Sequence, residues 1–453
     1  MTLSTRTGPA ERATAPEHGH RLGGAQGTAL LVGSVLGPGV LALPHLAADA
    51  AGPASIVAWA LLLLISAPVA LTFAALGARF PDGGGVASFA GRAFGPGVAA
   101  LVGWCFYAAV PLGVLSGALI GGDYVASAAG LGAPWPVVVA VTLLAGAYVT
   151  NHGGLRTSGR LQLVLVSVLV VLLAVAILAS GPDVRRGNFT PFTPHGVAGV
   201  VHAAGLLFFA FAGWEAASHL SADFADPARS LPRATGLALL IVGTLYLGLA
   251  ITTVGALGGQ AATSPVPLAL LLQEGVGDLA RETTGVVAVI LTFIAVNTYI
   301  AGGARLGAAL ARDGALPAGL SRGAAAGQVP HRSLFLLAGM TGLLTAVVIP
   351  FGLGLDTLMR ATAACLAAVT LVGMTAAIRL LPQGRHGRVL AGSAAVFTGV
   401  TMLSCGFFLL VPAVVAAVGA LVIRGRGRGR GEAEHDSARG LHNSTRSRID
   451  LGC

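Results

Sequence analysis

Glu215 and His219 are the residues of this sequence whose types and spacing could carry proton chemistry. They lie four positions apart in the apolar segment 208–220 (FFAFAGWEAASHL), so on a helix their side chains would share one face. A carboxylate and an imidazole on one face can share a proton or form an ion pair. His219 could equally bond a carbonyl group at the end of its helix, and both interpretations stay open.

A second segment is unusual for its backbone rather than its side chains. Residues 33–44 (GSVLGPGVLALP) place three glycines and two prolines in an otherwise apolar run. Gly and Pro are the poorest residues for a helix interior, and an unmade backbone hydrogen bond in hydrocarbon costs several kcal/mol. Close helix packing could also select small residues. Two such segments, one with a carboxylate, favour helices interrupted to bind a ligand with backbone atoms.

The chemistry of such a pair follows from the groups at helix ends. A half-helix that begins near Gly39 would present N–H groups and a positive dipole end to a carboxylate. A half-helix that ends near Phe211 would leave carbonyl groups for an ammonium. Together the two ends are suited to a zwitterion. Pro44 is predicted to kink the second half-helix.

The elements that would position these residues are membrane-spanning helices. The 453-residue chain is 55% hydrophobic and 10% charged, against roughly 25% charged in soluble proteins. Apolar runs of about 20 residues recur along it, as helical spans require. The sequence therefore predicts an all-α polytopic membrane protein, with the last two spans either separate or one kinked helix. The twelve predicted spans are 26–47, 54–79, 98–121, 135–151, 161–180, 197–221, 233–257, 284–309, 333–351, 355–380, 388–404 and 406–423.

The arginines predict the orientation. With the N-terminus inside, thirteen arginines fall in loops on the cytoplasmic side and four on the other side, which follows the positive-inside rule. We therefore expect residues 1–24 to be a disordered cytoplasmic tail and 25–423 to be the transmembrane domain. Residues 424–453 would be an Arg/Gly-rich disordered cytoplasmic tail that binds anionic lipid rather than nucleic acid.

Several activities are excluded by what the sequence lacks. It contains no lysine, so neither a Walker A loop nor a Schiff base can form. The glycines 83–85 precede no lysine, and no HExxH or GxSxG motif occurs. The four cysteines are scattered without a CxxC pair, which supports neither a zinc site nor a disulfide framework. We predict no enzyme activity, no cofactor and no metal.

Four segments carry a resemblance to a known family. GPGVLALP (37–44), together with residues 81–95, 213–234 and 304–317, resembles in order the signatures of the amino acid–polyamine–organocation superfamily. Within it, two segments are most similar to bacterial exporters of methionine and branched-chain amino acids. The resemblance implies a LeuT-like five-plus-five inverted repeat of about twelve helices, with helices 1 and 6 discontinuous. It also implies transport of small neutral amino acids by alternating access.

The resemblance also assigns roles to residues. It implies that the substrate carboxylate faces Gly37, Pro38, Gly39 and Val40. It implies that the amino group and side chain meet Phe209, Ala210, Phe211, Ala212 and Gly213. Glu215 matches a carboxylate that in relatives couples protonation or gating to substrate. Two departures stand out: Pro38 replaces a usual Ser or Thr, and span 5 carries no lysine.

The sequence thus predicts a secondary active transporter in the cell's inner membrane, exporting a neutral amino acid by proton antiport. Sodium as the coupling ion, and a monomer or homodimer, are left open. An importer or exchanger for another amine, such as a cationic amino acid, is the alternative within the class. A channel or membrane-embedded enzyme is the alternative outside it. Asn297 and Tyr299 could line the pathway or join helices.

Overall fold

The computed structural model describes residues 23–423 except 82–84, 155–158, 212, 222–223, 278, 324–327 and 382–384. Every regular element in this part of the chain is helical, which confirms the all-α prediction. The predicted tails 1–24 and 424–453 lie almost wholly outside the described residues. The long helices are α3 (Ser55–Arg79), α5 (Pro96–Ala128), α6 (Trp135–His152), α7 (Gly159–Ser180), α10 (Pro227–Leu257), α13 (Leu279–Arg312), α14 (His331–Val348), α15 (Leu355–Leu380) and α16 (Arg385–Ser404).

The surface of the bundle is as apolar as a membrane protein requires. Ten helical stretches among the described residues are long and apolar enough to cross a membrane. Large apolar side chains point outward from several of them, including Val149, Leu178 and Phe407. In water this surface would be unfavourable, but in hydrocarbon it costs nothing. The chain is therefore a multi-pass membrane protein.

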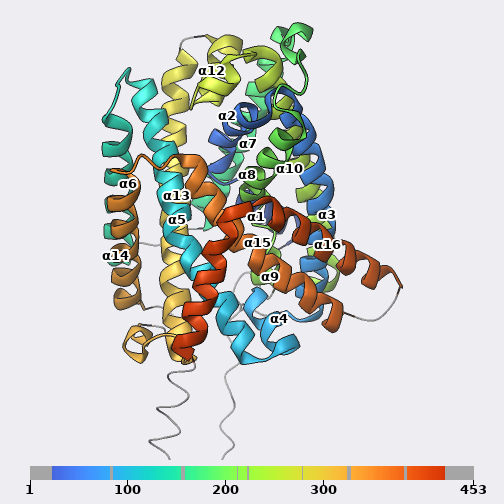
Figure 1. The fold of residues 1–453 in the computed structure, drawn as a ribbon, viewed down its shortest axis with the longest axis vertical. Coiled ribbons are helices and arrows are strands. Elements are labelled where there is room, and N and C mark those ends of the chain that lie inside the picture. Colours follow the sequence, from blue (N-terminus) through green and yellow to red (C-terminus); the bar gives the residue numbers. More distant parts are fainter. Residues whose placement is uncertain are drawn as a thin grey trace, which may run out of the picture.

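The long helices differ in how deeply they lie inside the bundle. The apolar stretch of α15 is 72% buried, whereas that of the final helix, Gly406–Ile423, is only 11% buried. Helix α5 packs against α6, α13 and α15, and α10 packs against α3. Figure 1 shows α5, α6, α13 and α14 on one side of the molecule and α3 and α10 on the other. The pairs that carry the two unusual segments lie between these groups.

Both unusual segments are interrupted helices. Helix α1 (Gly24–Val35) is followed after three residues by α2 (Gly39–Ala51). Helix α8 (Gly196–Phe211) is followed after four residues by α9 (Ala216–Leu220). In Figure 1, α2 and α8 lie in the upper half and α1 and α9 below them, and α2 packs along α8. Because α1 precedes α2 whereas α8 precedes α9, the two pairs run in opposite directions.

The last apolar segment is divided into two helices, and two further short helices lie at the ends of the bundle. Residues 385–423 form two helices, because α16 ends at Ser404 and Gly406 adopts a positive φ of 58°. The amphipathic α4 (Gly85–Phe94) lies at the lower end of the bundle and α12 (Pro267–Val276) at the upper end. These two short helices therefore lie at opposite ends of the bundle.

Candidate functional site

The first interruption is shaped by Pro38 and its neighbours. The Leu36 N–H donates to Val32 O at 2.8 Å and the Gly37 N–H to Val35 O at 2.8 Å, which closes the end of α1. Two amides at the start of α2 turn back on the same loop: Val40 donates to Gly37 O (3.2 Å) and Leu41 to Pro38 O (3.1 Å). Proline has no N–H. Among the described residues, the Gly39 N–H is therefore the amide at this helix start that has no partner.

This finding limits the carboxylate pole, which is the helix end predicted to bind a carboxylate group, to one amide. The sequence suggested several free amides at the start of α2, but a single amide at the positive end of the helix is available. An added Cβ at Gly37 would meet no atom within 4 Å, so this side of the loop is open. An added Cβ at Gly39 would lie 2.9 Å from the Phe209 ring, so that ring closes the other side.

The second interruption is organised by Glu215. One carboxylate oxygen, Oε2, accepts the Gly213 N–H at 2.8 Å. The Glu215 carbonyl oxygen accepts the Ser218 N–H at 2.9 Å, which starts α9. A charge held by an amide two residues away cannot swing far from the break. Glu215 is thus positioned at the interruption. The Phe211 and His219 side chains and residue Ala212 lie outside the described part, so the proposed Glu215–His219 pair stays a prediction.

The two interruptions touch each other through Gly213. Its φ is +138°, and an added Cβ would lie 2.4 Å from Ser34 O. The Ser34 hydroxyl lies 2.8 Å from Leu31 O and 3.2 Å from Gly213 O, and its single proton is shared between these two acceptors. Glycine is required here both for the backbone conformation and for the close approach.

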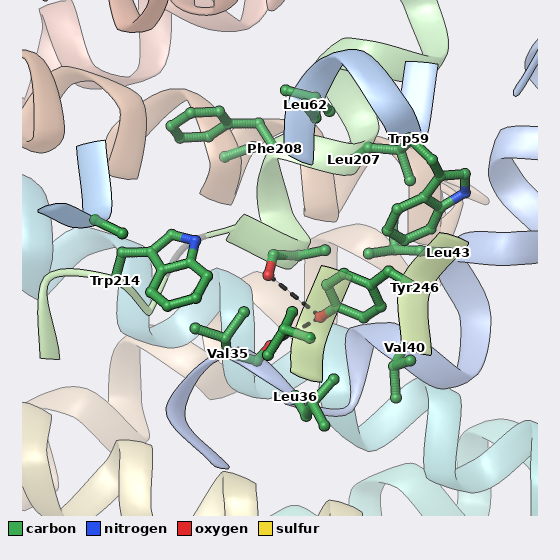
Figure 2. Close-up of a cluster of buried hydrophobic side chains, with 14 of the residues drawn as sticks. Val35, Leu36, Val40, Leu43, Trp59, Leu62, Leu207, Phe208, Trp214 and Tyr246 are labelled. Carbon is green, nitrogen blue, oxygen red and sulfur yellow. Dashed lines mark hydrogen bonds between the residues drawn. The ribbon is translucent and has the colours of Figure 1, made fainter. Parts of the chain in front are cut away.

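Tyr246, which the sequence analysis did not single out, bridges both breaks from α10. Its hydroxyl lies 2.9 Å from Val35 O and 3.3 Å from Ala210 O, the bonds drawn dashed in Figure 2. The residue is 1% exposed, and its ring packs 4.9 Å from Trp59 of α3. The carbonyl groups that close α1 and α8 therefore already face one phenol donor. A lone tyrosine in an apolar helix carries no sequence signal of such partners.

Asn297 and Tyr299, each predicted either to line the pathway or to join helices, have different surroundings in the structure. The Asn297 Oδ1 accepts from Thr150 Oγ1 at 2.7 Å and from Asn151 Nδ2 at 2.8 Å. Asn297 therefore joins α13 to α6. Tyr299 exposes 48% of its surface, yet its phenol is within electrostatic range of Glu215 and of Tyr246. Tyr299 therefore lies near the breaks.

The first interruption also packs against Gly117 of α5. An added Cβ at Gly117 would lie 3.3 Å from Pro38 and 3.3 Å from Val296 of α13. Pro38 thus sits directly on the α5 backbone. Of the other predicted site residues, Val40 and Ala210 are buried at 1% and 3% exposure. The structure therefore gathers Gly37, Gly39, Phe209, Gly213 and Glu215 around one junction, and adds Ser34, Tyr246 and Tyr299.

Antiparallel helices that are both interrupted at their junction, inside an apolar bundle, define the architecture of a secondary membrane transporter. The sequence profile of the family described as amino acid permease matches residues 22–426. The chain therefore belongs to the amino acid permease family, and it is a transporter rather than an enzyme.

Individual relatives agree with this assignment. YecA of Bacillus subtilis, named as an amino acid permease, is 33% identical over 411 residues, which cover 90% of this chain and 97% of YecA. The L-methionine/branched-chain amino acid exporter YjeH of Escherichia coli is 33% identical over 377 residues, or 82% and 88% of the two chains. The branched-chain amino acid permease BcaP of Bacillus subtilis is 28% identical over 350 residues, or 72% and 74%.

Proposed function

We propose that this permease exports a neutral, apolar amino acid such as methionine or a branched-chain amino acid, driven by proton antiport. The observation that carries the proposal is the junction of two interrupted helices with opposite directions. Similarity to YjeH supports the export of methionine and branched-chain amino acids, and similarity to BcaP supports a branched-chain substrate.

A zwitterion fits the backbone groups of the junction. Its carboxylate would meet the Gly39 N–H at the positive end of α2, with Gly37 and Pro38 beside it. Its ammonium would meet carbonyl groups at the ends of α1 and α8, where Val35 and Ala210 now accept from Tyr246. The substrate side chain would lie among Phe209, Phe211, Ala212 and Gly213, which are apolar or small and favour a neutral side chain.

Glu215 is the coupling group in this proposal. Its carboxylate holds the Gly213 amide at the break, so a change in its charge would change the geometry of the α8–α9 loop. Protonation would weaken that bond, since a charged acceptor forms the stronger hydrogen bond. His219, four residues further along α9, would share the proton. Proton binding and release at Glu215 would in this way change the geometry of the substrate site.

The proposal includes the finer architecture. The two interrupted pairs each count as one crossing, and α3, α5, α6, α7, α10, α13, α14, α15, α16 and Gly406–Ile423 as ten more. Twelve crossings follow, of which the first ten would form a five-plus-five inverted repeat. An even number puts both termini on one side, which we propose is the cytoplasm of an inner-membrane protein, present as a monomer or homodimer.

Counter-flow in proteoliposomes tests the function. Vesicles are loaded with methionine, leucine, arginine or no amino acid, and labelled uptake is followed with and without a pH gradient. We expect methionine and leucine to drive exchange and arginine to fail. A sodium gradient in place of the pH gradient separates the two coupling ions. Exchange of arginine alone, or flux without counter-flow, would overturn the proposal in favour of a cationic substrate or a channel.

Glu215→Gln tests the coupling. The amide keeps the size of the side chain but cannot change its charge. Counter-flow should persist in this variant, and the dependence of net flux on the pH gradient should disappear. Gradient-driven flux at the wild-type level would remove Glu215 from the coupling mechanism.

A further inference from the structure

A small cavity lies beside the α8–α9 interruption, and none of its lining residues comes from α1, α2 or α13. Its walls are formed by α3, α8, α15, α16 and the loop that carries Trp214 and Glu215. Most of the lining residues are apolar, but the hydroxyl-bearing residues Ser66, Thr370 and Thr398 also line it. The space accommodates about one water molecule. The cavity is thus separate from the proposed carboxylate pole of the substrate site.

A buried donor without a partner opens onto this cavity. Trp214 is 1% exposed, and its indole Nε1–H has no hydrogen-bond partner among the described residues. In Figure 2 this nitrogen lies on the edge of the ring toward Phe208, which lines the same cavity. A buried N–H without an acceptor is costly and uncommon. The cavity should therefore hold a group that can accept a hydrogen bond.

The hydroxyl groups specify the rest of that group's chemistry. Ser66 Oγ donates to Leu63 O at 2.9 Å, and Thr398 Oγ1 donates to Ala394 O at 2.7 Å. Each hydroxyl has one proton, so toward the cavity both can only accept. The occupant must accept from Trp214, and it can donate to the Ser66 or Thr398 hydroxyl. Water does both, whereas an apolar group does neither and a sodium ion cannot accept from an N–H.

We propose that this cavity is a binding site for one water molecule, which solvates the Glu215 carboxyl group from the side opposite the substrate. The water would accept the Trp214 N–H and donate to Thr398 or Ser66 and to Glu215. It gives Glu215 a polar partner that does not depend on whether substrate is bound. Its consequence for coupling rests on the proposed function, whereas its presence does not.

The groups described near Glu215 come from several elements. The Tyr299 phenol of α13 lies within electrostatic range of Glu215, and Tyr246 of α10 lies within electrostatic range of Tyr299. The cavity walls of α3, α15 and α16 present hydroxyl groups and apolar side chains and no charge. The side chain of His219 on α9 lies outside the described residues. A change of the cavity lining therefore acts on Glu215 through its solvation rather than through a new charge.

The first test detects the water through Trp214 itself. The background carries Trp59→Phe, Trp104→Phe and Trp135→Phe, so that the remaining indole reports on the cavity. Thr398→Leu fills the space, and Thr398→Val removes only the hydroxyl. Thr401→Leu is the matched control, because Thr401 lies one turn further along α16, is also buried, bonds its own helix (Phe397 O) and does not line the cavity.

We expect Thr398→Leu to shift Trp214 emission to shorter wavelength and Thr398→Val to shift it less. Thr401→Leu should leave the emission unchanged. No shift in Thr398→Leu, or an equal shift in Thr401→Leu, would show that no water is bound there. Should the leucine variant fail to fold, the valine variant decides by the same criterion.

The second test measures coupling. Without the water the charged form of Glu215 loses one hydrogen bond, so the carboxyl group keeps its proton to higher pH. The pH of half-maximal gradient-driven flux should rise by about one unit in Thr398→Leu, while counter-flow stays at the wild-type rate. Normal counter-flow with an unchanged pH profile would overturn the water site alone. Absence of counter-flow in the wild-type protein would instead overturn the proposed function.

Discussion

At the scale of single residues, hydroxyl groups rather than charges hold the two helix breaks together. Ser34 connects the end of α1 to Gly213, and Tyr246 contacts a carbonyl group of each break. Such bonds are weak enough to exchange with a ligand, since a neutral hydrogen bond contributes about 1 kcal/mol net. A substrate ammonium would have to share the Val35 and Ala210 carbonyls with the Tyr246 phenol.

Tyr246→Phe removes this competitor. We expect the substrate concentration at half-maximal counter-flow to fall about fivefold, which corresponds to about 1 kcal/mol. The protein should also lose about 1–3 kcal/mol of stability, because two buried acceptors lose their donor. Concentration-dependent counter-flow and thermal unfolding in detergent measure the two effects.

Tyr148→Phe is the control for this variant. The Tyr148 hydroxyl bonds Thr341 at 2.7 Å and joins α6 to α14, away from the breaks. Its loss should lower stability and leave the half-saturating concentration unchanged. If Tyr246→Phe behaves in the same way as Tyr148→Phe, the phenol does not compete with substrate.

At the scale of elements, the interruptions were predictable and their mutual contacts were not. Gly and Pro disfavour a helix wherever they occur, so residues 33–44 predicted the break between α1 and α2 from local chemistry. The Tyr246–Val35 bond, by contrast, spans 211 positions. Which carbonyl a buried tyrosine meets depends on the packing of α10, which no local pattern encodes. The side chain of Asn297 likewise had two plausible uses until the position of α6 was known.

Asn297→Ala tests the structural use of that side chain. The substitution removes the acceptor shared by Thr150 and Asn151 between α6 and α13. Polar contacts between membrane helices are worth about 0.6 kcal/mol on average and up to about 1.7, so the melting temperature should drop by a few degrees. Thr142→Ala is the control, because the exposed Thr142 hydroxyl bonds only the α6 carbonyl of Val138. A change in amino acid preference with Asn297→Ala would place Asn297 in the substrate pathway after all.

At the scale of the whole molecule, a group of exposed arginines at one end of the bundle predicts how it lies in the membrane. Arg79, Arg92 and Arg379 lie exposed where α3, α4 and α15 meet, and they stack on Phe80 or Phe94. Exposed guanidinium groups at this level favour the cytoplasmic leaflet, where anionic lipids and the positive-inside rule act together. Arg185 and Arg186 are at the opposite end, where Arg185 N–H bonds Gly255 O near the end of α10.

Cysteine labelling in intact cells tests this orientation with little engineering. Cys105, Cys365 and Cys405 are buried, so a membrane-impermeant maleimide should not reach them. We expect Cys453 to react only after the cells are opened, because the proposed orientation puts it in the cytoplasm. Arg186→Cys, in the exposed turn η3 (Arg186–Phe189), should react in intact cells. Arg322→Cys, after η5 (Ala318–Ser321) at the other end, should react only in opened cells. The reverse pattern would show that the bundle lies the other way round in the membrane. The α1–α9 side of the substrate junction would then face the outside of the cell, and the α2–α8 side would face the cytoplasm.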